Sequence, residues 1–206
     1  MPNPYPVLYR LGMDWWEGNE DTGPLPELVA RRGPGTALDA GCGTGRHAVW
    51  LAEQGWNVIG VDGVDKALRE ARDRARAAGV ADRTLFVRDD VTRMTAVPTT
   101  PPYDLVVDIG CFHGLRPDEQ AAFAAWVTRN TREDAAVVIL AVEPRTGIGP
   151  HGIDEATLAA TFGPGWSITT TPATTTGGGP LRHATFRWFT LTRPSAPAPE
   201  AEEPRP

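Results

Sequence analysis

The sequence predicts an α/β protein built on a mostly parallel β-sheet with helices on both faces. From Ala37 onward, segments with strand composition alternate with segments of helical periodicity, the pattern of a parallel sheet. Residues 136–142 form an apolar run typical of a strand buried on both faces. Residues 41–45 form a glycine-rich turn between the first such strand and the first helix. Together these features favour a nucleotide-binding type of α/β fold.

Strands and helices are expected to alternate over residues 36–162, except that the strands at 84–88 and 104–108 follow each other with only a loop between them. Residues 36–40 and 57–61 are predicted as strands that flank a helix at 45–54. The segment 64–78 is predicted as a helix because its alanines and Leu68 recur on one face at helical spacing. We expect further strands at 84–88, 104–108 and 136–142, and further helices at 117–131, where Pro117 suits the first turn, and at 154–162.

The C-terminal third predicts an antiparallel hairpin followed by a tail. Residues 166–171 and 183–192 are predicted as two strands joined by a long turn rich in threonine and glycine. Residues 194–206 consist mainly of proline, alanine and glutamate, which cannot bury apolar surface, so we expect a disordered tail. The main domain is therefore expected at 36–193, preceded by an N-terminal segment, 1–35, of loop and short helix.

Composition limits the classes of partner and compartment. The 206 residues suffice for one domain with a substantial core. A net charge of −6 argues against a nucleic-acid partner, which prefers a lysine- and arginine-rich surface. Two cysteines make neither a disulfide framework nor a metal site. We find no apolar run of about 18 residues and no charged-then-apolar leader, so we expect no membrane span and a cytoplasmic location.

The glycine-rich turn is the strongest functional signal in the chain. Gly41, Gly43 and Gly45 allow a tight bend and let a ligand approach the backbone without meeting a Cβ. The amides of the turn, with a helix N-terminus behind them, favour an anionic group. Asp62 ends the next strand, where its carboxylate is able to accept both hydroxyls of a ribose. A nucleoside-containing cofactor is therefore the first hypothesis.

The spacing of the turn separates several kinds of nucleotide site. The dinucleotide fingerprint is G-x-G-x-x-G, but Arg46 stands where its third glycine belongs. A P-loop needs Gly-Lys-Ser/Thr, and the single lysine of the chain is Lys66. Asp39 followed by G-x-G-x-G, with an acid ending the second strand, resembles motif I of the class I S-adenosylmethionine-dependent methyltransferases. The resemblance extends over residues 36–143 and implies their Rossmann-like, seven-stranded sheet with an antiparallel C-terminal strand.

The resemblance implies S-adenosylmethionine as the cofactor and assigns residues to it. Asp39 and the loop of Gly41, Gly43 and Gly45 would hold its methionine end, and Asp62 would bind its ribose. Further contacts to the adenine would come from Gly63 and Val64, and from Asp90 and Val91 after the third strand, with Asp89 as the alternative register. An exposed aspartate at a strand end can instead be a turn residue or a helix cap.

Residues 108–113 follow the fourth strand and carry a second motif, Asp-Ile-Gly-Cys-Phe-His. This stretch resembles motif IV of a subgroup that includes thiopurine-, tellurite- and halide/thiol-type small-molecule methyltransferases. By that resemblance the carbonyl near Ile109 takes the cofactor's ammonium, and Phe112 and His113 face the reacting methyl. His113 is then a candidate substrate contact or general base, with a purely structural hydrogen bond as the alternative. Cys111 is expected to be a small buried apolar residue.

Two further positions are candidates for the methyl acceptor's side of the site. Trp15 and Trp16 resemble the aromatic N-terminal segment that closes over the site in that subgroup, although the usual Pro-Trp context is absent. Packing on the surface or in the core is the alternative for this pair. Glu143 ends the fifth strand, from which it would point into the acceptor pocket.

The expected function is methyl transfer to a heteroatom (sulfur, nitrogen, oxygen or halide) of a small molecule, by a monomer or homodimer. No cluster of His, Cys and Asp has metal-ligand spacing, so no metal is expected. One alternative is a methyltransferase that modifies RNA or protein, which a basic rim around the pocket would favour. Another is a nucleoside-binding protein without catalysis, because fold does not dictate function.

Overall fold

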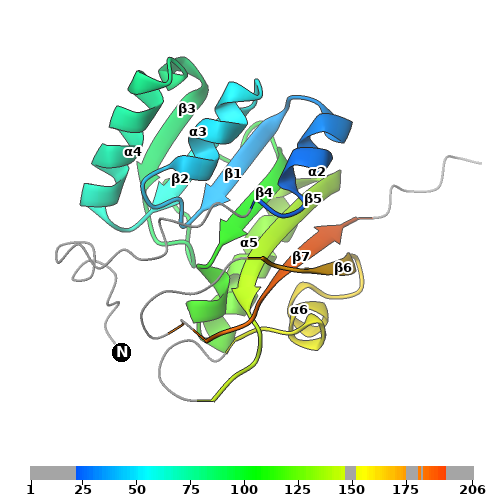
Figure 1. Ribbon diagram of the computed structural model, residues 1–206. Helices are drawn as coiled ribbons and strands as arrows, with labels where there is room; N and C mark the ends of the chain where they lie inside the picture. Colours follow the sequence, from blue (N-terminus) through cyan, green and yellow to red (C-terminus); the bar gives the residue numbers. More distant parts are fainter. Residues whose placement is uncertain (1–21, 147–151, 175–180, 182, 194–206) are drawn as a thin grey trace, which may run out of the picture.

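A seven-stranded sheet in the order β3-β2-β1-β4-β5-β7-β6 forms the centre of the computed structural model (Figure 1). The structure describes residues 22–146, 152–174, 181 and 183–193. β3, β2, β1, β4 and β5 are mutually parallel, whereas β7 pairs antiparallel with both β5 and β6. The predicted fold class is thereby confirmed, including the antiparallel C-terminal hairpin.

The order of the elements along the described chain follows the predicted one, with β3 followed directly by β4 and β6 by β7. The strands are β1 (Thr36–Ala40), β2 (Asn57–Asp62), β3 (Thr84–Arg88), β4 (Tyr103–Ile109), β5 (Thr131–Val142), β6 (Ser167–Pro172) and β7 (Phe186–Thr192). The helices are α2 (Leu25–Arg32), α3 (Arg46–Glu53), α4 (Asp65–Ala77), α5 (Pro117–Asn130) and α6 (Glu155–Phe162), with short 3₁₀ turns η1 (Ala81–Arg83) and η2 (Phe112–Gly114).

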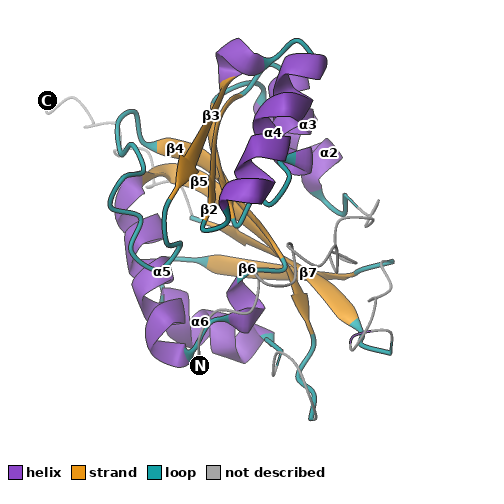
Figure 2. Cartoon of the chain, turned by 90° about the vertical axis from the view of Figure 1, so that its left-hand side faces the viewer, coloured by secondary structure: helices purple, strands orange, loops and turns teal. Residues whose placement is uncertain are grey.

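Helices cover both faces of the sheet. α2, α3 and α4 lie on one face and α5 and α6 on the other, as the two perpendicular views show (Figures 1 and 2). Each face has its own apolar cluster, and successive residues of β4 contribute to opposite clusters, Val107 to the first and Val106 to the second. This alternation follows from the pleat of a strand and explains why the central strands are apolar throughout.

Local sequence explains where the helices begin and end. α4 buries Ala67, Leu68, Ala71 and Ala75, the stripe that the helical spacing predicted. α6 begins at a cap in which the Asp154 carboxylate accepts a hydrogen bond from the amide of Thr157 at 2.8 Å. Because these signals lie within one or two turns of chain, they are readable before the fold is known.

The boundaries of β5 and of the final strand differ from the predicted ones. β5 begins at Thr131, five positions before the predicted start, and a register shift follows its first pairing with Tyr103. Residues 132–134 are exposed and polar, so the apolar pattern that marks a buried strand is absent there. The last strand begins at Phe186 rather than at residue 183.

The N-terminal segment divides into two parts. Residues 22–35 include α2, whose Leu25 and Leu28 are buried in the same apolar cluster as Trp188 of β7. Residues 1–21 lie outside the described residues, as does the tail 194–206. The expected closing of the N-terminal segment over the site therefore stays a prediction. Among the described helices, none combines the length and apolar character required to cross a membrane.

Candidate functional site

The candidate site lies at the carboxyl edge of the parallel strands. β1 and β4 are neighbours in the sheet. The next strand beyond β1 is β2, and the next strand beyond β4, on the opposite side, is β5. The strand order therefore reverses between them, and open α/β sheets bind ligands at this point. The segments that follow β1, β2, β3, β4 and β5 carry most of the residues that the sequence predicted for the site.

The glycine loop after β1 adopts a backbone that L-amino acids with side chains rarely adopt. Gly41, Gly43 and Gly45 have φ values of 72°, 52° and 75°. The amides of Gly41 and Cys42 both donate to the carbonyl of Val61, which ties the loop to the end of β2. A Cβ on Gly41 would lie 2.7 Å from the Cβ of Cys111, so the loops after β1 and β4 touch here. Glycine is required for this contact.

Gly45 has a packing role that changes the interpretation of Arg46. A Cβ on Gly45 would lie 2.7 Å from the Cβ of Ala71 and 3.1 Å from the Phe86 ring. The start of α3 therefore packs against α4 and β3 at Gly45 itself. Close packing, which the dinucleotide fingerprint assigns to its third glycine, is here provided one position earlier. Arg46 consequently causes no crowding and begins α3.

Asp62 joins the glycine loop to the turn after β2. Its Oδ2 accepts a hydrogen bond from the Gly43 amide at 3.0 Å, and its Oδ1 accepts one from the Val64 amide at 2.8 Å. These bonds orient the carboxylate between the two loops. Gly63 is open on its outer side, where a Cβ would meet nothing closer than the Asp89 carbonyl oxygen at 3.9 Å. The arrangement leaves room for a ligand along the turn 62–64.

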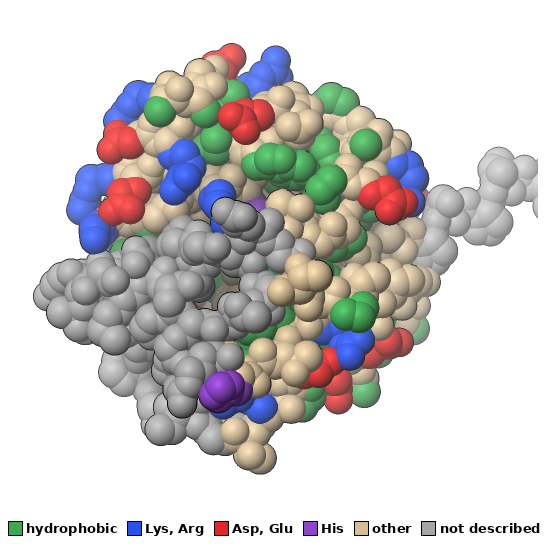
Figure 3. Space-filling view, viewed as in Figure 1, with side chains coloured by type: hydrophobic (Ala, Val, Ile, Leu, Met, Phe, Trp, Pro, Cys, Tyr) green, Lys and Arg blue, Asp and Glu red, His purple; other side chains and the backbone are tan. Residues whose placement is uncertain are grey.

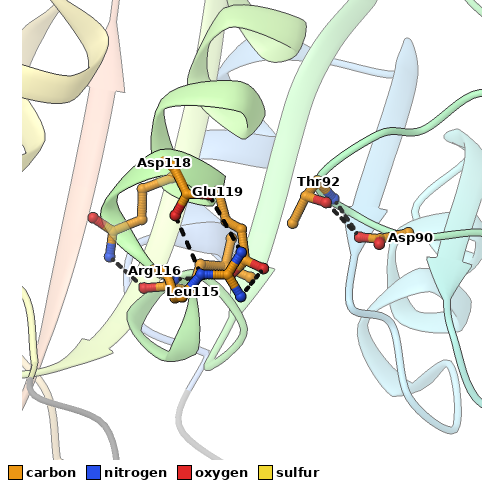
Figure 4. A network of polar contacts seen from close by, with 7 residues as sticks. Asp90, Thr92, Leu115, Arg116, Asp118 and Glu119 are labelled. Atoms are coloured by element: carbon orange, nitrogen blue, oxygen red, sulfur yellow. Dashed lines mark hydrogen bonds and ion pairs between the residues drawn. The ribbon is translucent and has the colours of Figure 1, made fainter. Parts of the chain in front are cut away.

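The two aspartates after β3 differ in their contacts. Asp89 holds its own loop, because its Oδ1 accepts from the Asp90 amide and its Oδ2 from the Ala96 amide. Asp90 accepts from both the amide and the hydroxyl of Thr92 through Oδ1, as Figure 4 shows beside the charged cluster at the start of α5. Burial pushes the pKa of Asp90 upward, but the bonds from Thr92 outweigh it, and the pKa is lowered. Asp90 is exposed and therefore available to a ligand.

Asp39 and Asp108 are buried acids on adjacent strands. Asp39 is 2 % exposed and lies opposite Gly60 and Val107 in the sheet register. Asp108 is fully buried, and its carboxylate accepts from the amides of Cys111 and Phe112, each at 3.0 Å. Burial raises the pKa of Asp108 to about 7, although both amide bonds oppose the increase. Asp108 thus fixes the turn that starts η2.

Within that turn Phe112 is buried in the core, and His113 makes the structural hydrogen bond that the sequence left open as an alternative. Phe112 is fully buried and stacks edge-on against Phe123 with ring centroids 5.4 Å apart. Its ring belongs to the apolar cluster beneath the sheet, which corrects the expectation that it faces an acceptor. His113 is 6 % exposed, and the amide of Val142 donates to its Nδ1 at 3.2 Å. Burial lowers the pKa of His113 to about 4.

The hydrogen bond to His113 decides its tautomer. Since Nδ1 accepts a hydrogen bond from the backbone, the neutral ring carries its own hydrogen on Nε2. A ring in this state donates a hydrogen bond and is poorly suited to remove a proton. The structural hydrogen bond, one of the two interpretations open from the sequence, is therefore present. It joins the turn after β4 to the end of β5.

Cys111 lies nearer the centre of the candidate site than the sequence suggested. Its side chain is half-buried rather than fully buried and lies against Gly41. Burial raises the pKa of the Cys111 thiol well above its usual value, and the negative charges of Asp108, Asp62, Asp90 and Asp39 add to the increase. Four carboxylates from three strands and a loop thus converge on this position. No local pattern in the sequence reports this convergence.

Glu143 follows β5 directly and forms an ion pair with Arg187. Its Oε1 accepts from Nε of Arg187 at 2.6 Å and also contacts the Nη2 of that arginine. Its charge is therefore balanced by the neighbouring strand β7, which the sequence did not indicate. Ile109 ends β4 and is half-buried against the first apolar cluster. Trp15 and Trp16 lie outside the described residues, and in the described part no group of three or more His, Cys, Asp and Glu side chains could hold a metal ion.

On the face of the molecule that Figure 3 shows, the described residues do not form a large patch of one charge. Basic and acidic side chains alternate over α4, and apolar side chains gather over the region of α2 and α3 (Figure 3). Interspersed charge of this kind does not form the continuous basic stripe that tracks a phosphate backbone.

Comparisons with known proteins agree with this geometry. Residues 37–134 match the model of a family described as a methyltransferase domain. An uncharacterised methyltransferase of Schizosaccharomyces pombe is 30 % identical over 104 residues, which are 50 % of this chain and 69 % of that protein. The 2-heptyl-1-hydroxyquinolin-4(1H)-one methyltransferase of Mycobacteroides abscessus is 26 % identical over 138 residues, 65 % of this chain and 60 % of that protein.

The fold also has close counterparts among solved structures. One, described as "Conversion of a Disulfide Bond into a Thioacetal Group during Echinomycin Biosynthesis", superposes with a TM-score of 0.74 at 25 % sequence identity. The superposition covers 94 % of this chain and 93 % of that one. The likeness therefore extends over nearly the whole length of both chains and shows a shared fold.

Proposed function

Because the chain belongs to the class I S-adenosylmethionine-dependent methyltransferases, we propose that it transfers the cofactor's methyl group to a heteroatom of a small molecule. Two similar proteins support a small acceptor: one is named for a hydroxyquinolone, and one structure is described by a sulfur reaction of echinomycin biosynthesis. The net charge of −6 supports the same choice over an RNA acceptor.

The proposed placement of the cofactor follows the loops of the carboxyl edge. The amides of the glycine loop and Asp39 hold the methionine end, and the Asp62 carboxylate accepts from the ribose hydroxyls. Gly63, Val64, Asp90 and Val91 border the adenine, and the carbonyl of Ile109 accepts from the ammonium. The observation that carries this proposal is the Asp62 carboxylate, which both loop amides hold at 2.8 and 3.0 Å between the two cofactor loops.

The residues present fit this group in shape and charge. The turn at Gly63 is open, because a Cβ there would meet nothing closer than 3.9 Å, and glycine at position 41 lets the loop pack against Cys111. The carboxylates of Asp39, Asp62 and Asp90 around Cys111 supply a negative field suited to a cationic sulfonium and ammonium. The bound cofactor supplies an activated methyl group, so the protein chiefly aligns the partners and excludes water.

We infer that His113 donates a hydrogen bond from Nε2 to the acceptor and does not act as a base. The occupied Nδ1 and the pKa lowered to about 4 both support a neutral ring with its proton on Nε2. An acceptor that is already deprotonated, or that carries a lone pair without a proton, then needs no base. Thiolates, ionised N-hydroxy compounds and halides meet this requirement, because each has a further lone pair that accepts the hydrogen bond while another attacks the methyl group.

The direct test is methyl transfer from labelled S-adenosylmethionine to a panel of thiols, halides, phenols, N-hydroxyquinolones and amines. We expect label in one small-molecule class with the native chain and none with Asp62→Ala, which loses the ribose acceptor. Arg76→Ala, a surface change outside the site, serves as the control. Label that appears only in added RNA or protein would replace a small acceptor by a macromolecular one. Absence of binding to S-adenosylhomocysteine by the native chain would contradict the cofactor placement itself.

A further inference from the structure

The glycine loop is held from outside by a residue of α4. Nε of Arg74 donates to the carbonyl oxygen of Thr44 at 3.0 Å, and Nη2 of Arg74 donates to the Thr44 hydroxyl oxygen at 3.2 Å. Thr44 lies between Gly43 and Gly45 and is 4 % exposed. The planar guanidinium thus binds both the backbone and the side chain of Thr44 in the middle of the loop.

The carbonyl of Thr44 lies just outside the hydrogen-bond ladder of α3. The first bond of that ladder runs from the Val49 amide to the Gly45 carbonyl at 2.9 Å. α3 begins at Gly45 without a side-chain cap, so the helix does not fix the residues that precede it. A local turn bond from the Gly45 amide to the Cys42 carbonyl at 2.8 Å spans this position. Arg74 adds a restraint from 30 residues away in sequence, which ties the loop to α4.

A second contact makes α4 a platform for the same loop. Ala71 lies one turn before Arg74 on α4, so the two residues face the same way. A Cβ on Gly45 would be 2.7 Å from the Cβ of Ala71, which means that the loop backbone rests directly on the helix. The loop is therefore fixed on both sides, by Ala71 and Arg74 from α4 and by Asp62 through the Gly43 amide.

From this geometry we propose that Arg74 is a positioning residue for the cofactor: it holds the loop 41–45 so that its amides face the methionine end. The inference rests on the proposed placement of the cofactor on that loop. The guanidinium also places a full positive charge behind amides that already favour an anionic carboxylate. Arg74 itself touches neither the cofactor nor the acceptor in this proposal.

The test is the affinity for S-adenosylhomocysteine, measured by calorimetry without any acceptor. Arg74→Ala removes two charge-assisted hydrogen bonds to the loop, so we expect about tenfold weaker binding. Arg74→Lys restores a cation but not the planar fork, so its loss should be smaller. Arg76→Ala removes an arginine of the same helix whose contact is the surface residue Asp73, and its affinity should stay within about twofold of native.

Thermal unfolding of the ligand-free proteins separates positioning from general stability. We expect Arg74→Ala and Arg76→Ala to unfold at similar temperatures without ligand, and S-adenosylhomocysteine to stabilise the first much less. Equal affinities for native and Arg74→Ala, or equal losses in both alanine variants, would overturn the proposal. If Arg74→Ala does not fold, the comparison of Arg74→Lys with native decides on the same criterion. Failure of the native chain to bind would instead overturn the cofactor placement, as would unimpaired binding by Asp62→Ala.

Discussion

At the scale of single residues, the site depends on side chains whose hydrogen-bond partners fix their chemical state. Asp62 is oriented by two amides, Asp90 by Thr92, and His113 by the amide of Val142. Each is near the position that the motif predicted, but its partner determines what it is able to do. For His113 the partner occupies Nδ1, which supports the donor role that we propose over that of a general base.

The role of His113 can be tested with a matched pair of substitutions. His113→Asn keeps an acceptor near the Nδ1 position for the Val142 amide but removes the Nε2 donor. We expect turnover to fall by about tenfold, the order expected for one lost hydrogen bond. His113→Gln places an amide nitrogen near Nε2 and should retain more activity if the fold accepts the loss of the Val142 bond.

The pH profile provides the second measurement for this residue. Because burial lowers the pKa of His113 to about 4, its charge does not change near its ordinary value of 6.5. Turnover of the native enzyme should therefore show no inflection attributable to this ring near pH 6.5. A loss of roughly 10²- to 10⁴-fold in His113→Asn, together with such an inflection, would identify a general base instead.

At the scale of elements, the glycine loop and α4 form one unit with β2 and β3. Gly60 of β2 belongs to this unit, because a Cβ there would lie 2.7 Å from the Phe86 ring and 3.0 Å from the Cys42 sulfur. Phe86 in turn contacts Gly45. The loop that we propose to bind the cofactor is thus supported by three elements and not by its own turn chemistry alone.

Gly45→Ala tests whether the packing of the loop against α4 affects stability beyond the cost of a left-handed backbone. We expect a loss of about 2 to 4 kcal/mol in the free energy of unfolding. The alanine must adopt the left-handed backbone conformation of Gly45, and its Cβ also crowds Ala71. Gly79→Ala is the control: its φ of 72° is close to the 75° of Gly45, but nothing lies within 4 Å of its Cβ. It should lose only about 1 to 2 kcal/mol.

Chemical denaturation of both variants gives the comparison. Adding Ala71→Gly to Gly45→Ala should recover part of the loss by removing the methyl group that the new side chain meets. Equal losses in Gly45→Ala and Gly79→Ala would mean that crowding between the loop and α4 contributes nothing measurable.

At the scale of the whole molecule, a fully buried acid near the end of β4 makes stability depend on pH. Burial raises the pKa of Asp108 from 3.8 to about 7, so the folded state binds this proton more tightly than the unfolded state does. The contribution of Asp108 to stability is therefore greatest at low pH and declines as the pH rises from 3.8 to about 7.

Asp108→Asn removes this titration while keeping an oxygen that accepts from the Cys111 and Phe112 amides. We expect the free energy of unfolding of Asp108→Asn, minus that of the native protein, to increase steadily from pH 3.8 to about 7 and then to level off. Urea denaturation at a series of pH values measures this. Asp118→Asn should show the opposite slope and only below about pH 3.8, because the neighbouring Arg116 side chain lowers the pKa of Asp118 from 3.8. A difference for Asp108→Asn that is constant with pH would refute the linkage.

The fold class, the glycine loop, Asp62 and the acids that end the strands were all predictable from sequence. Strand and helix periods, turn glycines and helix caps are local signals, and the order of elements then leaves few topologies open. Their placement at one edge follows because parallel strands share their carboxyl ends. The polar start of β5 was missed because residues 132–134 lack the apolar pattern of a buried strand.

Tertiary structure alone decided what several of these residues contact. His113 meets Val142 from 29 positions away, Glu143 meets Arg187 from 44, and Arg74 meets Thr44 from 30. These pairings depend on sheet register and on how α4 and η2 pack, which no local pattern encodes. The sequence by itself therefore determined the architecture and the glycine loop that we propose to bind the cofactor, whereas packing between distant segments decided the tautomer of His113, the burial of Phe112 and the support of the loop by α4.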